Sequence, residues 1–328
     1  MTENHTCIVA LSNINGIGPV TIRRLISYFN QPAEVIKTPL STLIHIPGIG
    51  EQTARIIKKN IEDGLKKAEA ILKKCTHKSI KITTLIDDDY PFLLKSCEDA
   101  PPVIYYYGDV SSASEKTIAF VGTRKPSSYG ISICERIVSE FKGTDVVIIS
   151  GLAEGIDSIA HSSALSSELK TIAILPASPD VIYPPSNKKL AYKIIENGGA
   201  LISEFPPDTP LHKELFPRRN RIIAGISKAT VIVESRIDGG AMITATYALE
   251  YKRKLFCIPA RITDESFSGS LHLMTNGKAT PITSAKDIIS SLKWDTSLNT
   301  RSSIKKPLSL TREEETVIRI LREREALD

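Results

Sequence analysis

The sequence predicts an α/β protein whose core is a Rossmann-like, doubly wound and mostly parallel sheet. Six short runs rich in β-branched residues lie between positions 117 and 258, and each ends in glycine, proline or a charged loop. Several of these runs lead through a glycine-bearing loop into an amphipathic stretch, which is the strand, loop and helix repeat of such sheets. Ligands bind beyond the carboxyl ends of these strands, where helix N-termini meet anions. The pattern therefore predicts a phosphate-binding protein.

The first 80 residues are expected to form a small all-α domain with an internal repeat. The segments LSNINGIGPVTIRRLISYF (11–29) and LIHIPGIGEQTARIIKK (43–59) each place Gly-Ile-Gly before a short helix. Glycine permits positive φ in such a turn, and the next helix has free N–H groups. The repeat resembles a tandem helix-hairpin-helix (SAM-like) module, whose turn amides hold a nucleic-acid backbone without reading bases. Gly48 and Gly50 would then be secondary backbone contacts, and a plain helical-hairpin turn is the alternative.

Two further segments precede the predicted parallel sheet. A lysine-rich helix places Lys59, Lys66 and Lys73 seven residues apart, opposite an apolar face. We interpret these lysines as the solvated side of a packed helix, with a polyanion site as the minority alternative. Residues 81–110 are expected to form a bridging extension, in which residues 103–107 form an edge strand. Its tyrosines could stack on a base, but we favour the edge strand.

The loops lack the two common nucleotide-binding fingerprints. The first strand leads into Gly122-Thr123-Arg124, and no second glycine follows until Gly130. The second strand ends in Ser150-Gly151 rather than in the acid that binds a ribose hydroxyl. No Gly-Lys-Ser or Gly-Lys-Thr occurs anywhere in the chain. NAD-dependent redox chemistry and P-loop ATP hydrolysis are therefore poorly supported.

The loops instead carry small residues, hydroxyls and arginines. Arg124 can form a forked contact with phosphate, and Ser150, Gly151 and Gly155 could turn backbone amides toward an anion, with Asp157 as a helix cap. Residues 216–225 (FPRRNRIIAG) concentrate arginines ahead of an apolar helix, where the helix dipole is already positive. Salt bridges to glutamates are the alternative, and we expect both uses. The glutamates available for this are Glu204, Glu214 and Glu234.

At this point the chain is similar to the DprA/Smf family of bacterial DNA-processing proteins over about residues 80–293. The similarity rests on motifs that occur in the family's order and spacing: GTRKPSSYG (122–130), SGLAEGIDSIAH (150–161), TIAILPASPDVIYPPSNKKL (171–190), ISEFPPDTP (202–210), FPRRNRIIAGIS (216–227), ESRIDGGAMITATYALE (234–250) and CIPA (257–260).

The resemblance implies a cytoplasmic, non-enzymatic protein that binds single-stranded DNA, protects incoming DNA and helps to load RecA in natural transformation. It implies a homodimer, and it implies neither a cofactor nor a metal. The DNA- or phosphate-binding residues that it implies are Arg124, Lys125, Ser150, Gly151, Arg218, Asn220, Arg221, Gly240 and Thr244.

The chain departs from the family pattern in three loops. Residues 176–180 read PASPD where the family has glycines, so proline rings replace some backbone amides. The usual Ser-Gly-Ser of the fifth loop is Gly239-Gly240-Ala241, and the usual Pro-Gly after the sixth strand is Pro259-Ala260. These departures affect individual contacts rather than the fold.

Composition agrees with a nucleic-acid partner and argues against several other classes. The formal net charge of +5 and the pI near 8.8 permit a polyanionic partner. No apolar run approaches the roughly 20 residues of a membrane span, and the N-terminus does not resemble a signal peptide. The five cysteines are scattered without a CxxC pair, which favours free thiols over a zinc site.

A nucleotide-binding sensor or a phosphoribohydrolase of the LOG type is the alternative function. Enzymes of that class carry the motif Pro-Gly-Gly-x-Gly-Thr, followed closely by a catalytic glutamate. Here Gly239-Gly240 is followed by Ala241-Met242-Ile243-Thr244, without that carboxylate. A sensor would need the same phosphate pocket without the acid, so it stays open.

Two predictions concern assembly and the chain's end. The segment 267–282 is the candidate dimer surface, through Leu271, Leu273 and Met274, although these side chains could equally close the last helix onto the sheet. Residues 294–328 are expected to form a linker and the short first helix of an incomplete winged-helix domain, either truncated or vestigial, with a capping box at Thr311 and Glu314.

Overall fold

The computed structural model describes residues 2–29, 31–113 and 116–294. The expected linker from position 295 and the winged-helix start therefore lie outside the described residues. None of the helices in the described ranges is long and apolar enough to cross a membrane.

The N-terminal segment folds into the expected helical repeat. Its helices are α1 (Glu3–Ser12), α2 (Pro19–Tyr28), α3 (Glu34–Lys37), α4 (Leu40–Leu43) and α5 (Glu51–His77). Gly16 and Gly48 occupy equivalent turns with φ of 86° and 78°, and Gly18 and Gly50 are the N-cap residues of α2 and α5. The two Gly-Ile-Gly turns thus have one geometry, because the first glycine takes the left-handed backbone and the second begins the helix.

Helix α5 is amphipathic as predicted. Its three evenly spaced lysines are exposed, while Ile61 and Ala68 are buried against the other N-terminal helices. The end of the helix is tied to the sheet domain by ion pairs. Lys78 lies 2.6 Å from Asp180 and 2.8 Å from Asp208, and Lys74 lies 2.7 Å from Asp208.

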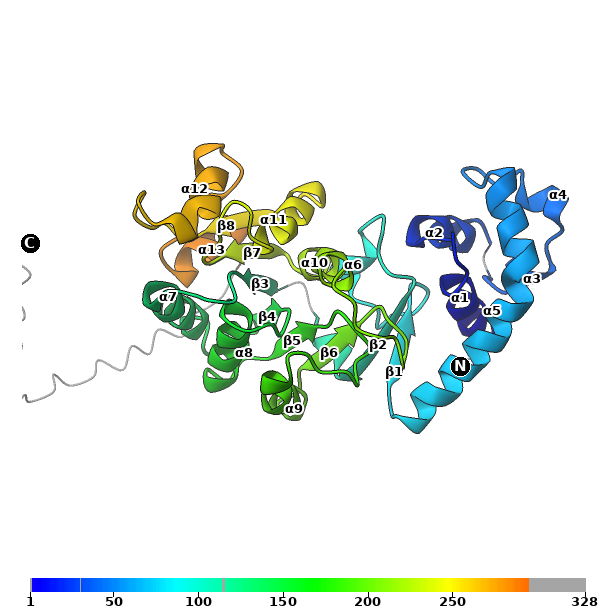
Figure 1. Cartoon of the computed structure of the whole chain (residues 1–328), viewed down its shortest axis with the longest axis horizontal. Coiled ribbons are helices and arrows are strands. Elements are labelled where there is room, and N and C mark those ends of the chain that lie inside the picture. The colour runs from blue at the N-terminus through cyan, green and yellow to red at the C-terminus, as the bar shows by residue number, and fades with distance from the viewer. Residues whose placement is uncertain (1, 30, 114–115, 295–328) are drawn as a thin grey trace, which may run out of the picture. The chain divides into compact units, whose positions relative to one another are not determined.

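The described residues build one nine-stranded sheet in the order β1-β2-β6-β5-β4-β3-β7-β8-β9 (Figure 1). The six predicted strands are all present and run parallel to their neighbours within this group. They are β3 (Thr117–Val121), β4 (Val147–Ser150), β5 (Thr171–Ile174), β6 (Ala200–Ser203), β7 (Ala229–Ile232) and β8 (Lys254–Cys257), with β9 (Thr280–Pro281) at one edge.

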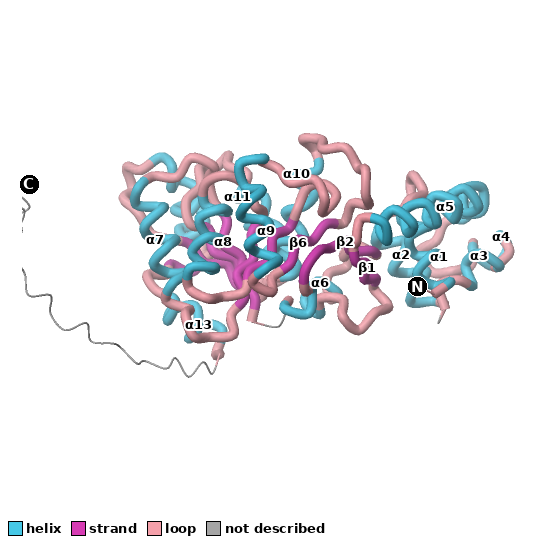
Figure 2. The backbone as a smooth tube through the Cα atoms, turned by 90° about the horizontal axis from the view of Figure 1, so that it is seen from below, coloured by secondary structure: helices cyan, strands magenta, loops and turns pink. Residues whose placement is uncertain are grey.

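The prediction of an edge strand at residues 103–107 is wrong. Strand β2 (Val103–Gly108) pairs antiparallel with β6 on one side and with β1 (Lys81–Thr84) on the other, so β1 is the edge. Tyr105 and Tyr106 are 1% and 7% exposed and belong to the cores on the two faces of the sheet. They present no stacking face to a base. Figure 2 shows β1 and β2 at the side of the sheet that meets α1, α2 and α5.

Helices cover both faces of the parallel strands. In Figure 1, α8 (Ile156–Ser166) and α9 (Lys188–Glu196) lie on one side of the strands, and α11 (Ala241–Glu250) and α12 (Ser268–Thr275) lie on the other. The remaining helices of this region are α6 (Phe92–Lys95), α7 (Ser128–Ser139), α10 (Leu215–Ile226) and α13 (Ala285–Leu292). Chain order reverses at β3, which lies between β4 and β7. A ligand crevice is expected at this reversal.

The candidate dimer residues lie on α12 with unequal exposure. Leu273 is 4% exposed and fills the main hydrophobic core, and Met274 packs partly buried against the same core. Leu271 is half-buried. Leu273 therefore packs α12 onto the sheet, which was the alternative to a dimer contact.

Candidate nucleic-acid interface

A crevice of about 470 Å³ lies where the strand order reverses. The loops after β3, β4 and β7 line it, together with the first turn of α8, residues 216–223 of α10 and the start of α11. Each loop follows the carboxyl end of a parallel strand, so the crevice is where the fold class places a binding site. Of the predicted residues, Arg124, Lys125, Asn220, Gly240 and Thr244 line it.

Arg124 stands exposed at the rim of the crevice, in the loop after β3. Its guanidinium lies over the ring of Phe216, 5.4 Å from the ring centre, and the ring of Tyr183 meets Phe216 nearly edge-on. The loop rests on Gly155, which has a φ of 77° and whose Cβ, if present, would lie 2.3 Å from the Thr123 carbonyl oxygen. Gly155 was expected to turn its amide toward an anion. In the structure its lack of a side chain instead allows the backbone of the Arg124 loop to pack against it.

The N-terminus of α7 is filled by a carboxylate of the protein itself. Glu234, at the end of β7, is 1% exposed and accepts hydrogen bonds from the backbone N–H of Ser127 at 2.9 Å and from its hydroxyl at 3.0 Å. A Cβ on Gly130 would lie 2.0 Å from the carboxylate. In dinucleotide-binding folds a pyrophosphate occupies the equivalent helix terminus. Here Glu234 takes that place, and within the part of the chain that the structure describes it forms no ion pair with an arginine.

The loop after β4 is likewise satisfied internally, which corrects the expectation for two residues. The Ser150 hydroxyl is fully buried and donates to the Phe120 carbonyl at 2.7 Å. The Gly151 amide donates at 3.1 Å to the buried carboxylate of Asp157, which also accepts from Ala153 at 3.4 Å. Burial raises the pKa of Asp157, although the nearby Arg219 opposes this shift. Ser150 and Gly151 therefore shape the floor and present no free donor to a ligand.

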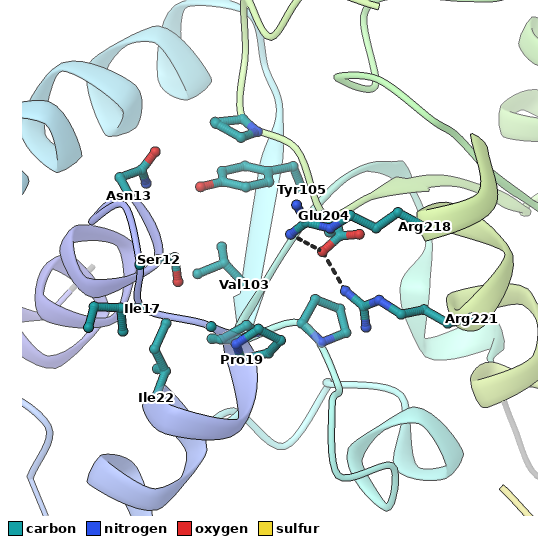
Figure 3. Close-up of a pocket in the computed structure, with 15 residues that line it drawn as sticks. Ser12, Asn13, Ile17, Pro19, Ile22, Val103, Tyr105, Glu204, Arg218 and Arg221 are labelled. Atoms are coloured by element: carbon teal, nitrogen blue, oxygen red, sulfur yellow. Dashed lines mark hydrogen bonds and ion pairs between the residues drawn. The ribbon is translucent and has the colours of Figure 1, made fainter. Parts of the chain in front are cut away.

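The arginine run divides between two faces of α10, and this corrects the predicted cluster. At about 100° per residue, Arg219 and Asn220 turn toward the crevice, whereas Arg218 and Arg221 face away from it. Both of the latter bind Glu204, with Nη2 to Oε2 distances of 3.1 Å for Arg218 and 2.5 Å for Arg221 (Figure 3). The salt-bridge alternative thus holds for Glu204.

Arg219, absent from the predicted set, lies at the base of the crevice. It is 4% exposed, and its Nη1 donates to the carbonyl oxygens of Gly151, at 2.5 Å, and of Ile174. Its Nε donates to the side-chain oxygen of Asn220 at 3.1 Å. Burial lowers the pKa of Arg219 to about 10, so it remains charged at neutral pH. The arginine run was expected ahead of the helix. Because residues 218–221 lie inside α10, the rotation of about 100° per residue points Arg219 to a different side from Arg218 and Arg221.

The start of α11 forms the opposite wall. Gly240 is the exposed N-cap residue, and a Cβ there would meet no described atom within 4 Å. Asn220 donates to its carbonyl at 3.4 Å, while Thr244 is buried one turn further along. Gly48 and Gly50 lie in the N-terminal hairpin and are not among the residues that line this crevice. The crevice therefore combines exposed cations, a helix start and an aromatic face.

Comparison with known families decides the relationship of the chain. The sequence model of DNA recombination-mediator protein A matches residues 81–293, and that of the SAM-like helix-hairpin-helix tandem matches residues 8–63. The chain belongs to the DNA recombination-mediator protein A family. The resemblance to DprA/Smf proteins is thereby confirmed, and the Rossmann-like sheet with its helical N-terminal region is the fold expected of such a member.

Relatives and solved structures agree with this membership. Protein Smf of Synechocystis sp. is 35% identical over 290 residues, covering 87% of this chain and 71% of that protein. The structure of DNA processing protein A from Streptococcus pneumoniae matches with a TM-score of 0.74 and 29% identity, over 88% of this chain and 98% of that one. A structure of DNA processing protein A from Helicobacter pylori is described for its single-stranded DNA binding mode. It matches with a TM-score of 0.58 and 31% identity, over 65% of this chain and 96% of that one.

Proposed function

We propose that this member of the family binds single-stranded DNA through its sugar-phosphate backbone at the crevice. The observation that carries the proposal is the pair of exposed cations at its rim. Arg124 and Lys125 line the crevice, and neither forms an ion pair with any described residue. Unpaired arginine and lysine side chains at a concave surface attract phosphates without reading sequence.

The form of the crevice favours a strand over a small nucleotide. Glu234 and Asp157 already occupy the backbone amides that a dinucleotide's pyrophosphate would use. What remains is a cationic rim beside Phe216 and the 41% exposed ring of Tyr183. Aromatic faces next to a cationic groove are the combination that holds unpaired bases and their phosphates. A duplex keeps its bases stacked inside and gains nothing from those rings.

The relatives support the same substrate. The Helicobacter pylori protein, 31% identical to this chain, is described as binding single-stranded DNA, and the Bacillus subtilis and Streptococcus pneumoniae relatives are named DNA processing proteins. On this basis the proposal extends to a role in which the chain protects incoming DNA and helps to load RecA. It includes a homodimer formed through residues 267–282, with half-buried Leu271 as its apolar contact. Sedimentation equilibrium tests the dimer, and a monomeric mass that persists with DNA present would refute it.

The hydrolase alternative lacks support at the crevice. Asp157 is the only carboxylate among the described residues that line it, and its oxygen accepts from two backbone amides. An oxocarbenium-like sugar needs a carboxylate that faces it. Release of free base from nucleoside monophosphates above a heat-inactivated control would favour the enzyme instead.

Fluorescence anisotropy with labelled oligo-dT and with a matched duplex tests the proposal across a salt series. Substituting Arg124→Ala removes a phosphate contact, so we expect affinity to fall about tenfold and the slope of log K against log salt to decrease by about 0.7. Lys193→Ala, which removes an exposed cation of α9 away from the crevice, is the control and should leave both unchanged. A folded Arg124→Ala protein with wild-type affinity at every salt concentration would refute the site.

A further inference from the structure

A basic hollow of about 250 Å³ lies at the amino ends of β7 and β8, whereas the crevice lies beyond the carboxyl end of β7. The two sites share no residue, and roughly 20 Å of chain separates positions 228 and 235 at about 3.3 Å per strand residue. Five of the described residues that line the hollow are basic and none is acidic. We call this surface the lysine face. Its basic residues are Lys228, Lys252, Arg253, Lys254 and Lys293.

Lysines stand at the start of several parallel strands, and those of the lysine face differ from the others in lacking a carboxylate partner. Lys116 precedes β3 and lies 2.9 Å from Asp145, and Lys170 precedes β5 with an aspartate 3.7 Å away. Lys228 precedes β7 and Lys254 begins β8, and neither forms an ion pair with a described residue. The same holds for the other two lysines of the face. Its positive charge is therefore not neutralised within the described part of the chain, and it is available to an anionic partner.

Two lysines of the face occupy backbone positions that favour glycine. Lys252 follows the end of α11 and Lys293 follows α13, with φ of 56° and 54°. A side chain in this left-handed region is strained, and glycine is the usual residue just after a helix. A cation near a helix C-terminus gains a little from the helix dipole, which the strain offsets. The local backbone therefore requires a lysine at neither position, and glycine can replace both without loss of stability.

Arg253 supports the lysine face from within. Its Nη2 atom donates to the Leu93 carbonyl at 2.7 Å and to the Gly225 carbonyl at 3.1 Å. These bonds tie the connection between α11 and β8 to α6 and α10, and so they fix the backbone on either side of Arg253. Lys252 and Lys254, which are both exposed, thus lie on a connection of fixed position. The cations that can meet a partner are the four lysines.

The remaining lining residues narrow the class of partner. They are half-buried Ser291 and Leu292, so the described lining contains no aromatic ring. The volume of the hollow is below the range of small-ligand sites, which is about 300–1,000 Å³. A protein partner gains most from a large anchor in a pocket, and an unpaired base gains most from a stacking face. The lysine face offers neither, whereas lysines contact phosphates as point charges without reading sequence.

We propose that the lysine face binds the phosphate backbone of double-stranded DNA. A duplex carries one phosphate charge per about 1.7 Å of its axis, twice the density of one strand, and its bases are already stacked and need no aromatic face. The proposal does not depend on the crevice, because the two sites share no residue. If the crevice holds a single strand, as proposed above, the chain engages both DNA forms at opposite ends of the sheet, as at a junction between them. Only this last step rests on the proposed function.

Fluorescence anisotropy of the full chain with a labelled blunt duplex, and separately with labelled oligo-dT, tests the proposal across a salt series. Lys252→Gly combined with Lys293→Gly removes two charges of the face and relieves the left-handed strain, so this variant should melt no lower than the wild type. Lys228→Gln combined with Lys254→Gln removes the other two lysines by a different substitution, so the test does not rest on one folded variant. Circular dichroism and thermal melting verify the fold of each.

The control removes two exposed lysines from another surface. Lys189 and Lys193 on α9 line neither the lysine face nor the crevice, and neither forms an ion pair with a described residue. Lys189→Gln combined with Lys193→Gln therefore changes the net charge equally without altering the face. Trp294, the one tryptophan of the chain, directly follows Lys293 and reports where DNA binds. Its emission should change on saturation with the duplex and not with oligo-dT.

We expect each variant of the face to weaken duplex binding about tenfold and to flatten the slope of log K against log salt by about 1.8, for two lost phosphate contacts. Oligo-dT affinity should stay unchanged, and the control should alter neither. Duplex binding through the face without any oligo-dT binding would leave the face standing and refute the proposed function.

Three results would overturn the proposal: duplex binding that neither variant of the face weakens, an equal loss in the control, or an equal loss for oligo-dT. Poly-glutamate that displaces the duplex at an equal concentration of charge would also overturn it, because the face would then fit an acidic protein segment.

Discussion

The Nη1 atom of Arg219 donates a hydrogen bond to the carbonyl oxygen of Gly151 at 2.5 Å, and this contact joins α10 to the loop after β4. The approach is so close that a Cβ on Gly151 would lie 2.2 Å from Nη1. Because the same nitrogen also donates to the Ile174 carbonyl, the guanidinium cannot move without breaking two buried hydrogen bonds. The absence of a side chain at residue 151 thus positions the arginine at the base of the crevice.

Gly151→Ala should therefore lower the free energy of unfolding by about 2–4 kcal/mol, because it displaces a buried charge from its acceptors. Urea denaturation followed by circular dichroism measures the change. Gly240→Ala is the control, since its Cβ would meet no described atom within 4 Å and its φ of −60° suits any residue. A Gly151→Ala protein as stable as Gly240→Ala would contradict the role assigned to this contact.

Gly155→Ala should destabilise the protein more than Gly143→Ala does. Both glycines have positive φ, 77° and 82°, so alanine is strained at each by about 1 kcal/mol. At Gly155 the added methyl group would also lie 2.7 Å from the Arg124 Cα, so backbone must shift, whereas at Gly143 it meets no described atom within 4 Å. We expect an additional 1–3 kcal/mol at Gly155, roughly the cost of overpacking, and weaker oligo-dT binding. Equal unfolding free energies for the two variants would show that the loop adapts freely.

His161 should make the fold sensitive to acid. Its ring is fully buried, with Nδ1 2.7 Å from the Thr171 hydroxyl, and burial lowers its pKa to about 3, with a further contribution from Arg219. The unfolded chain takes up a proton near the ordinary histidine pKa and the folded protein does not. Stability is therefore fully present above that pKa and is lost as the pH falls toward 3.

Between pH 7.5 and pH 5.5, the protonation of this one group in the unfolded chain should lower the free energy of unfolding of the wild-type protein by about 1.4 kcal/mol, which corresponds to one pKa unit. Chemical denaturation at the two pH values measures it. His161→Gln keeps a polar side chain that does not titrate, so its loss over the same interval should be smaller by that amount. If the two proteins lose the same free energy, His161 is not the source.

Phe216→Leu should weaken single-stranded DNA binding by about 1–3 kcal/mol, the usual contribution of a stacked base, and leave duplex binding unchanged. The ring of Phe216 lines the crevice and lies beneath Arg124, so it offers an aromatic contact to an unpaired base next to a cation for its phosphate. Phe92→Leu is the matched control, because Phe92 is 67% exposed on α6 and lies outside the crevice. Anisotropy titrations with both DNA forms provide the measurement. An equal loss for single and double strands would show that Phe216 acts through Arg124 alone.

The sequence by itself determined the six parallel strands and the two Gly-Ile-Gly turns. Strand periodicity, glycine and capping residues act over a few positions, so local chemistry is sufficient to predict them. The position of Arg124 was also predictable, because it follows a strand directly and parallel strands end at a common edge.

Only the tertiary structure decided which polar groups face a ligand. Arg218, Arg219, Asn220 and Arg221 are adjacent in sequence, but helical rotation assigns them to two different cavities. Glu234 lies more than a hundred positions from Ser127, yet it occupies the helix terminus that the sequence offered to a phosphate. Strand β2 is internal rather than an edge because β1 and β6, distant in sequence, pair with it. Such long-range contacts leave no local signal, and they determine which donors remain free.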